Sequence, residues 1–179
     1  MLFLLFQIGN DRYALEARHA VEVIPFLELK KIPQAARGVA GIFNYRGRPV
    51  VAVDLCELSF GQPARELLST RIIVVNFPNP AGPSHWLGLI AEHATGMMRR
   101  EPRDFVHSGI KTGEAPHLGP VVMDDQGVIQ LLHAEHLLTA TLRDLLGDET
   151  LAFAPPESGV RPVVTESFAR PSGITHEPD

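Results

Sequence analysis

The sequence predicts a mainly β protein built from small β-barrels. Short runs of β-branched and aromatic residues recur through residues 2–132, and turn-forming residues such as Gly, Pro, Asn and Asp separate them. The run at residues 50–53, Val-Val-Ala-Val, contains no polar residue, which is typical of a strand covered on both faces. A helical stripe of leucines occurs near residues 134–146. Roughly eight to ten short strands with one short C-terminal helix indicate small barrels.

Turn and breaker residues divide the first part of the chain into short elements. Pro25 ends one of them, because proline disfavours the α region at the residue before it. The expected elements are a strand at 2–8, a hairpin turn at 9–12, a strand at 13–15, a helical turn at 16–20, an extended segment at 21–24 and a connecting loop at 26–36.

Residues 37–55 contain two apolar runs joined by a polar corner, which predicts two strands and a turn. Gly47 follows Arg46 at this corner, and glycine tolerates positive φ without steric cost. The chain can therefore turn sharply and leave the Arg46 guanidinium projecting from the bend. A buried strand beside an exposed, donor-rich cation suits a recognition surface better than a reaction centre.

The second part of the chain is predicted to form two further hairpins before the helix. Asp124-Asp125-Gln126-Gly127 supplies turn geometry between two β-prone runs. The expected elements are a brief helix or turn at 54–58 that ends at Gly61, a loop or short helix at 62–69, strands at 71–77 and 86–91 around a turn cluster at 78–83, an amphipathic segment at 92–105, a loop at 107–117, strands at 120–123 and 128–132, and the helix at 134–146.

The composition changes after Gly147. Residues 147–179 contain five prolines and no sustained periodicity, so a Pro-rich and largely disordered tail is expected there. Residues 1–146 are predicted to hold the folded part, either as one domain or as two very small units that share a core.

Overall composition excludes several classes of partner. The formal charge is −5 and the basic residues form no cluster, so general attraction to nucleic acid or to an anionic membrane is not expected. The apolar start, residues 1–6, lacks a basic flank and is much shorter than the ~20 residues of a membrane span, which favours a buried strand. Cys56 is the single cysteine, so no disulfide framework is expected, and a reducing cytoplasm fits.

Catalytic and metal-binding patterns are weak. The chain has eight histidines, and His133 and His136 would share one face of a helix, but no third ligand for zinc is marked by its spacing. The sequence contains no Gly-x-Ser-x-Gly elbow, phosphate-binding loop or dinucleotide-binding glycine pattern. These absences favour a protein that works by binding, without catalysis and without a cofactor.

Four segments in order along the chain resemble the CheW-like adaptor family of bacterial chemosensory signalling. They are Phe6 with Tyr13-Ala14-Leu15 and Val21-Glu22-Val23-Ile24; Gly38 to Gly47 followed by Val50 to Leu55; Gly88-Leu89-Ile90-Ala91-Glu92; and Gly119 to Leu132 with Leu137-Leu138. The second segment is similar to the family's Gly-Val-x-Asn-Leu-Arg-Gly and Pro-Val-x-Asp-Leu signature. Tyr45 departs from it, since leucine is usual there, and Ala91, Ala94 and Met97 fall on a surface that the family uses toward receptors.

This resemblance implies two small SH3-like five-stranded β-barrels side by side, as two subdomains within residues 1–146. It also implies a non-catalytic adaptor in the cytoplasm, at the receptor array, that bridges the cytoplasmic tip of a chemoreceptor (a methyl-accepting chemotaxis protein) and the regulatory domain of a CheA-type histidine kinase. No nucleic acid and no direct membrane insertion are expected. The expected binding positions are Ala20, Glu22, Val23, Gly41, Tyr45, Arg46, Gly47, Ala94 and Met97.

Other interpretations remain open at the level of sequence. Arg46 can instead brace its own turn, and Glu22 can be either its partner or an exposed strand residue. A second class of function is a ligand- or metal-binding barrel that uses the histidines. A third is a protein that competes for receptor or kinase without coupling them.

Overall fold

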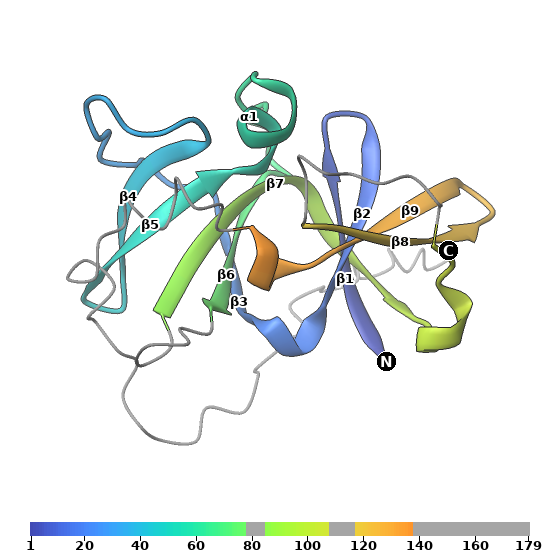
Figure 1. Cartoon of the computed structure of the whole chain (residues 1–179). Helices are drawn as coiled ribbons and strands as arrows, with labels where there is room; N and C mark the ends of the chain where they lie inside the picture. The colour runs from blue at the N-terminus through green and yellow to red at the C-terminus, as the bar shows by residue number, and fades with distance from the viewer. Residues whose placement is uncertain (78–84, 108–116, 138–179) are drawn as a thin grey trace, which may run out of the picture.

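The computed structural model describes residues 1–77, 85–107 and 117–137, and nine strands occur in these ranges. In chain order the elements are β1 (Leu2–Ile8), β2 (Asp11–Glu16), the 3-10 turn η1 (Ala17–His19), β3 (Ala20–Pro25), β4 (Val39–Tyr45), β5 (Arg48–Asp54), α1 (Leu55–Phe60), β6 (Arg71–Phe77), β7 (His85–Arg99), η2 (Pro102–Asp104), β8 (Leu118–Asp124), β9 (Gly127–Leu132) and η3 (Ala134–His136) (Figure 1). The predicted mainly β fold is confirmed.

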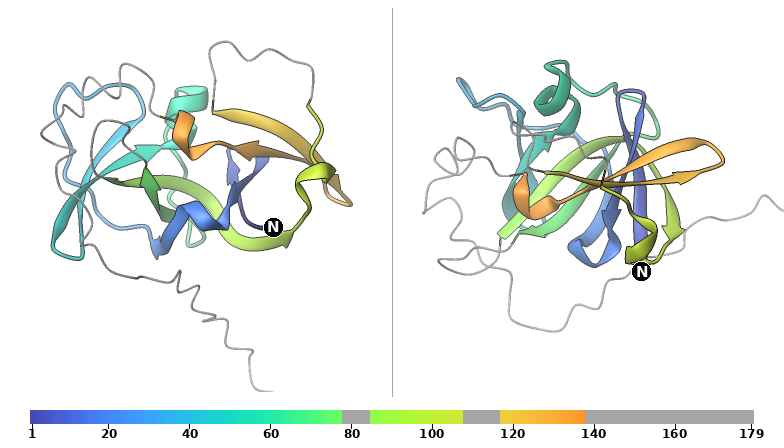
Figure 2. Two further views of the ribbon diagram at one scale, coloured as in Figure 1. Left: turned by 60° about the horizontal axis from the view of Figure 1, so that its bottom comes forward. Right: turned by 45° about the vertical axis from the view of Figure 1, so that its right-hand side comes forward.

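The strands form two groups of five that share β7. The first group follows the order β3-β6-β7-β5-β4, and the second follows β7-β1-β2-β9-β8. Each group contains one parallel pair, β5 with β7 and β2 with β9, while the other pairs are antiparallel. Figures 1 and 2 show the two groups side by side, with β7 running between them. This is the arrangement of two SH3-like barrels that the resemblance implied.

The long strand β7 changes partners where it leaves the first barrel. Its residues from His85 to Ala91 pair with β6, and those from Glu92 to Arg99 pair with β1. At the change of partner, one residue of β1, Phe6, lies opposite three residues of β7, 93–95, and His93 adopts a positive φ of 47°. Such a bulge bends a strand, and here it lets one strand follow two curved sheets.

The prediction for residues 92–105 needs correction. This segment has helix-like spacing of apolar residues, but residues 92–99 continue β7, and only Pro102–Asp104 forms a short 3-10 turn. Burial alternates along the strand, since His93 and Thr95 are exposed while Ala94 lies in the core. Pairing with β1 supplies the backbone hydrogen bonds, so tertiary contacts decide the structure where local propensity is weak.

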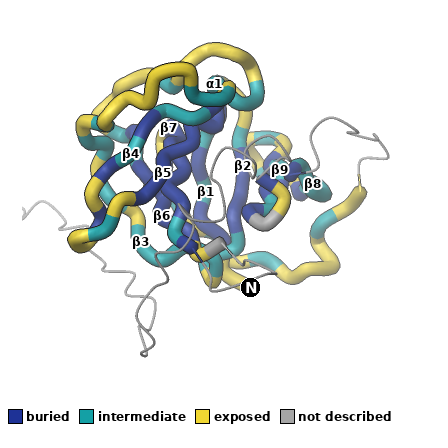
Figure 3. The backbone as a smooth tube through the Cα atoms, turned by 60° about the vertical axis from the view of Figure 1, so that its left-hand side comes forward, coloured by how far each residue is buried: buried dark blue, intermediate teal, exposed yellow. Residues whose placement is uncertain are grey.

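Apolar side chains fill one shared core and one smaller core in each barrel. The shared core contains Leu4, Val53 and Leu89, from β1, β5 and β7, and Leu137 closes it after η3. Phe43, Ile72 and neighbouring residues fill the first barrel, and Phe3, Ala14 and Ile129 belong to the second. Burial follows the strands closely, and exposed residues gather in the connecting loops (Figure 3). The shared core joins the two barrels into one packed body.

An ion pair between the buried Glu92 and the half-exposed Arg65 holds the loop after α1 against β7. The Glu92 side chain is 2% exposed, and its carboxylate accepts hydrogen bonds from the Arg65 backbone N–H at 2.7 Å and from the Arg65 guanidinium at 3.0 Å or less. The Arg65 guanidinium holds the pKa of Glu92 below its ordinary value, although burial acts in the opposite direction. Residues 62–69, predicted as a loop or short helix, form a loop held by this pair.

Several expectations fall outside the described residues. These are the turn cluster at 78–83, most of the loop at 107–117, the C-terminal helix beyond Leu137 and the tail at 147–179. Among the described residues, no helix has the length and apolar character needed to cross a membrane.

Gly88 on β7 is predicted to be intolerant of a side chain. An added Cβ would lie 2.6 Å from Phe43 Cε1 and 2.9 Å from Ile72 Cγ2, inside the core of the first barrel. Gly88→Ala should therefore lower the free energy of unfolding by about 1–3 kcal/mol, as overpacking does. Urea denaturation measures the change. The control is Gly96→Ala on the same strand, whose nearest contact would be 3.3 Å, to Leu5, and which should cost less than about 1 kcal/mol. Equal losses in the two variants would contradict the packing argument.

The Arg12–Asp124 pair predicts an acid-sensitive contribution to stability. The Arg12 guanidinium donates to both Asp124 oxygens, at 2.6 and 2.8 Å, and this lowers the pKa of Asp124 from 3.8 to about 2. Because the folded pKa is depressed, the pair stabilises the fold above pH 3.8, and this contribution is lost as the pH falls through about 2.

Thermal melting of wild type and Asp124→Asn measures this contribution. The wild type should be more stable at neutral pH, and the difference should shrink as the pH falls from 3.8 to about 2. Asp125→Asn, at an exposed neighbouring position, is the control and should change little at any pH. A difference that persists at the lowest pH would refute the assignment.

Candidate partner-binding site

The corner between β4 and β5 is a two-residue hairpin turn made by Arg46 and Gly47. Tyr45 pairs with Arg48 across it, and the two turn residues have φ values of 52° and 80°. Two successive positive φ values define a type I′ turn, which matches the twist of paired strands. The Gly47 N–H donates to Asn44 Oδ1 at 2.8 Å, which fixes the bend. Arginine is uncommon at positive φ, and the Arg46 side chain lies over the neighbouring Tyr45 ring.

Glu22 on β3 joins this corner through its carboxylate. The Tyr45 hydroxyl donates to Glu22 Oε2 at 2.6 Å, and Arg46 Nη2 donates to the same oxygen at 2.9 Å. β3 and β4 are the two outer strands of the first barrel and do not pair with each other in the described residues. The side-chain bonds of Glu22 therefore connect two strands that lack backbone hydrogen bonds to each other.

Four side chains form a row in which two aromatic rings lie between two arginines. The Arg46 guanidinium lies 5.2 Å from the Tyr45 ring centroid, and the Tyr45 and Trp86 rings meet edge to face at 5.0 Å. The Arg48 guanidinium lies 5.7 Å from the Trp86 centroid. We call Arg46, Tyr45, Trp86 and Arg48 the cation–aromatic row. Cation–π contacts of this kind keep both guanidiniums close to aromatic rings and limit their freedom.

The electrostatics of the corner favour binding over proton transfer. Burial, together with the hydrogen bond to Glu22, raises the pKa of Tyr45 to about 12, so the hydroxyl stays protonated and donates near neutral pH. The side chains of Arg46 and Glu22 are 53% and 37% exposed, and ion pairs this exposed contribute about 0–1 kcal/mol to stability. Much of the Arg46 guanidinium thus remains available to a partner.

The structure brings together some of the predicted binding positions and separates others. Glu22, Tyr45, Arg46 and Gly47 meet at the corner, and Val23 is exposed on the same outer strand as Glu22. The hydrogen bond between Arg46 and Glu22 confirms the pairing that the sequence left open. Trp86 and Arg48 were not expected from the sequence, because nothing in their spacing marks their contacts with Tyr45.

The other predicted positions lie away from the corner or inside the protein. Ala20 is half-buried against the shared core, and Ala94 is only 4% exposed within it, so Ala94 does not form part of a surface groove as expected. Gly41 is buried, and a Cβ there would lie 2.6 Å from the Lys30 carbonyl oxygen. Met97 is 41% exposed on the part of β7 that belongs to the second barrel.

The histidine pair that the sequence singled out has a third histidine nearby. The ring centroids of His133 and His136 lie 5.6 Å apart. The backbone N–H of His133 donates to the backbone carbonyl oxygen of His117 at 2.8 Å. His117 is buried, which lowers the pKa of its imidazole. Even so, the described residues contain no group of three His, Cys, Asp or Glu side chains that could hold a metal ion.

The buried Cys56 fits a packing role. Burial raises the pKa of its thiol to about 11, so the thiolate is disfavoured.

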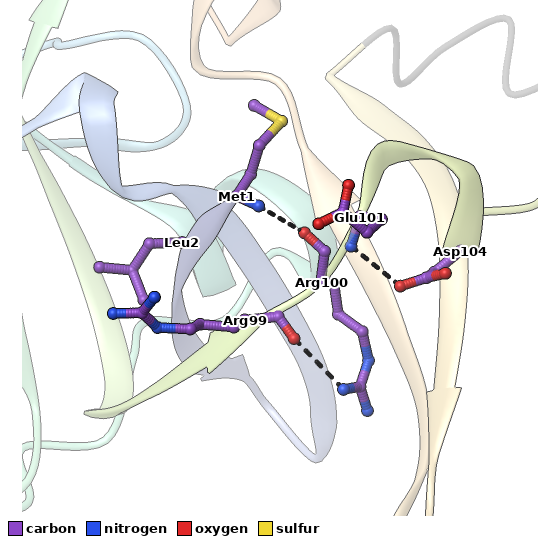
Figure 4. Close-up of a pocket in the computed structure, with 6 residues that line it drawn as sticks. All are labelled: Met1, Leu2, Arg99, Arg100, Glu101 and Asp104. Carbon is purple, nitrogen blue, oxygen red and sulfur yellow. Dashed lines mark hydrogen bonds between the residues drawn. The ribbon is translucent and has the colours of Figure 1, made fainter.

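A hollow of about 380 Å³ lies at the opposite end of β7 from Trp86 (Figure 4). It is lined by Met1, Leu2, Arg99, Arg100, Glu101 and Asp104. Internal hydrogen bonds use several of its polar groups, including Met1 N to Arg100 O at 2.7 Å and Glu101 N to Asp104 Oδ2 at 2.9 Å. Its side chains carry both signs of charge, which gives no clear preference for an anion or a cation.

Two barrels that share β7, with a polar corner at the turn between β4 and β5, define a β-barrel scaffold. Comparison with known proteins identifies its family. The family model described as the CheW-like domain matches residues 2–142, so the chain belongs to the CheW-like family. A crystal structure of the scaffolding protein TtCheW from Thermoanaerobacter tengcongensis is similar, with a TM-score of 0.68 and 18% identity over 79% of this chain and 90% of that chain. No curated protein matches the chain significantly in sequence.

Family membership supports the adaptor predicted from the sequence, and the metal- or ligand-binding alternative is not favoured. The match over residues 2–142 includes all four segments and confirms the predicted resemblance, and the structural similarity confirms the fold. A CheW-like scaffold implies a chemoreceptor and a CheA kinase as partners.

Tyr45→Phe tests the connection between β3 and β4. Phenylalanine keeps the ring contacts but removes the hydroxyl that donates to Glu22, so the free energy of unfolding should fall by about 1 kcal/mol. Urea denaturation measures the loss. The control is Tyr13→Phe, because no hydrogen bond of the Tyr13 hydroxyl occurs among the described residues. A neutral Tyr45→Phe, or an equal loss in the control, would show that the hydrogen bond to Glu22 does not stabilise the fold.

Proposed function

We propose that this protein is a non-catalytic adaptor that couples a chemoreceptor to a CheA-type histidine kinase in a bacterial chemosensory array. The observation that carries the proposal is the CheW-like match over residues 2–142, together with the two-barrel fold. The proposed contacts are the cytoplasmic tip of the receptor and the regulatory domain of the kinase. The proposed location is the cytoplasm, at the array.

A rigid body suits this function. The two barrels share β7 and one apolar core, so surfaces on different barrels keep a constant relative geometry. An adaptor of this kind holds receptor and kinase in register, and a conformational bias of the receptor then shifts the population of active kinase. No chemical step by the adaptor is required.

The corner at β4 and β5 is the proposed receptor-binding surface. Arg46 supplies directional donors toward carboxylate or carbonyl groups, while Glu22 holds its guanidinium from one side. Val23, on the same strand as Glu22, adds exposed apolar surface to the corner. Met97 is exposed on the second barrel and is proposed as a separate apolar contact, since methionine adapts to slightly different partner helices. Gly41, Gly47, Ala20 and Ala94 contribute by shaping the backbone and the core beneath these side chains.

Competition for the same partners is the remaining alternative. A competitor would bind receptor or kinase yet lower the kinase activity of the assembled complex. Kinase activity reconstituted from receptor and kinase, with and without the chain, separates coupling from competition.

Arg46→Ala tests the proposed receptor contact. Loss of hydrogen bonds made by a charged group should weaken co-sedimentation with receptor-containing membranes by about tenfold. The melting temperature should hardly change, because the Arg46–Glu22 pair is largely exposed. Arg103→Ala, at an exposed position in η2, is the matched control. A large loss of stability with unchanged binding per folded molecule would assign Arg46 a purely structural role.

A further inference from the structure

We propose that Arg48 is a second anchor for the receptor, and that it binds a carboxylate on an acidic segment of the docking partner beside Arg46. This inference rests on the proposed function and specifies the chemistry of the segment that the corner receives.

The Arg48 guanidinium contains a buried N–H donor, at Nη1, that has no acceptor in the described part of the chain. Its Nη1 is shielded from solvent and has no hydrogen-bond partner, and no acidic side chain in the described part of the chain forms an ion pair with it. A buried N–H without an acceptor is unfavourable, and a charged one more so. An incoming acceptor that reaches this guanidinium, after a small shift of the side chain, would remove that cost.

The carboxylate of the corner is already engaged. Glu22 Oε2 accepts from both the Tyr45 hydroxyl and Arg46 Nη2, and nothing connects Glu22 to Arg48. The corner therefore holds two guanidiniums and one carboxylate, which leaves one net positive charge at a site on a chain of net charge −5. This local excess complements an acidic partner segment.

Trp86 preorganises Arg48 for such a partner. The guanidinium lies 5.7 Å from the indole centroid, and Trp86 is itself held edge to face by Tyr45. The cation–π contact restricts the position of the guanidinium, so less freedom is lost when it binds the two oxygens of a carboxylate. Aromatic and arginine side chains in contact are also common among the residues that dominate binding energy.

A protein carboxylate fits this site better than a nucleic acid. Two arginines at one turn do not form the basic stripe that phosphate backbones require, and the chain as a whole is acidic. A carboxylate needs only one well-oriented guanidinium. The cation–aromatic row is thus suited to binding a single acidic side chain of the receptor.

The test measures binding of the full chain to a purified cytoplasmic fragment of the receptor by titration calorimetry. Arg48→Gln should weaken binding about tenfold and reduce its dependence on salt. Arg48→Lys, which keeps the charge but not the planar fork, should fall between wild type and Arg48→Gln. Arg103→Gln is the control and should bind like wild type.

A double-mutant cycle identifies the carboxylate. Acidic residues of the fragment are changed one at a time to their amides. One change should weaken binding to the wild type but have little further effect on Arg48→Gln. Wild-type binding by folded Arg48→Gln and Arg48→Lys, or the absence of any coupled acidic residue, would overturn the role of Arg48 and leave the adaptor function intact. Failure of the wild type to bind the fragment would overturn both proposals.

Discussion

The continuous pairing of β7 is the constraint on which the rest of the structure depends. One strand of 15 residues pairs with β5 and β6 in the first barrel and with β1 in the second. Its side chains must therefore fit two cores, which explains the close packing around Gly88 and the irregular backbone at His93. Where β7 changes partners, Glu92 is buried, and Arg65 neutralises it while anchoring the loop after α1. The fold thus places a strong polar interaction at the boundary between the barrels.

The proposed receptor-binding corner lies where β3 and β4 approach without direct backbone pairing to each other in the described residues. β3 and β4 are outer strands of their sheet, and side chains connect them through Glu22, Tyr45 and Arg46. Polar side chains at such a seam can change their hydrogen bonds without disturbing a backbone ladder. A binding surface there can respond to a partner while the shared core and β7 keep their geometry. This separation of a rigid frame from an adaptable seam suits an adaptor.

The sequence predicted most strands because turn residues bracket clear β-prone runs, and it predicted the Arg46 corner because glycine follows it. It failed at residues 92–99, where Gly, Ala and Met have weak strand preference and only pairing with β1 reveals the alternation. Ala94 was expected on a partner-facing surface from the family resemblance, and it lies in the core because pairing with β1 turns its side chain inward. Contacts between Trp86 and Arg48 join residues far apart in sequence on different strands, and local patterns carry no information about such contacts.

Tyr45 links the core of the first barrel to the proposed receptor-binding corner. The signature that this segment resembles has leucine here, a residue whose side chain cannot form a hydrogen bond. Tyrosine fills the same buried position, donates to Glu22 and contacts Trp86, and through Trp86 it reaches Arg48. In the described residues the Arg46 guanidinium donates to Glu22 through Nη2, which leaves its other donors available for an external acceptor. The buried Tyr45 therefore connects the two arginines, and a change at this position is expected to alter the proposed receptor-binding surface from beneath while the backbone of the barrel stays in place.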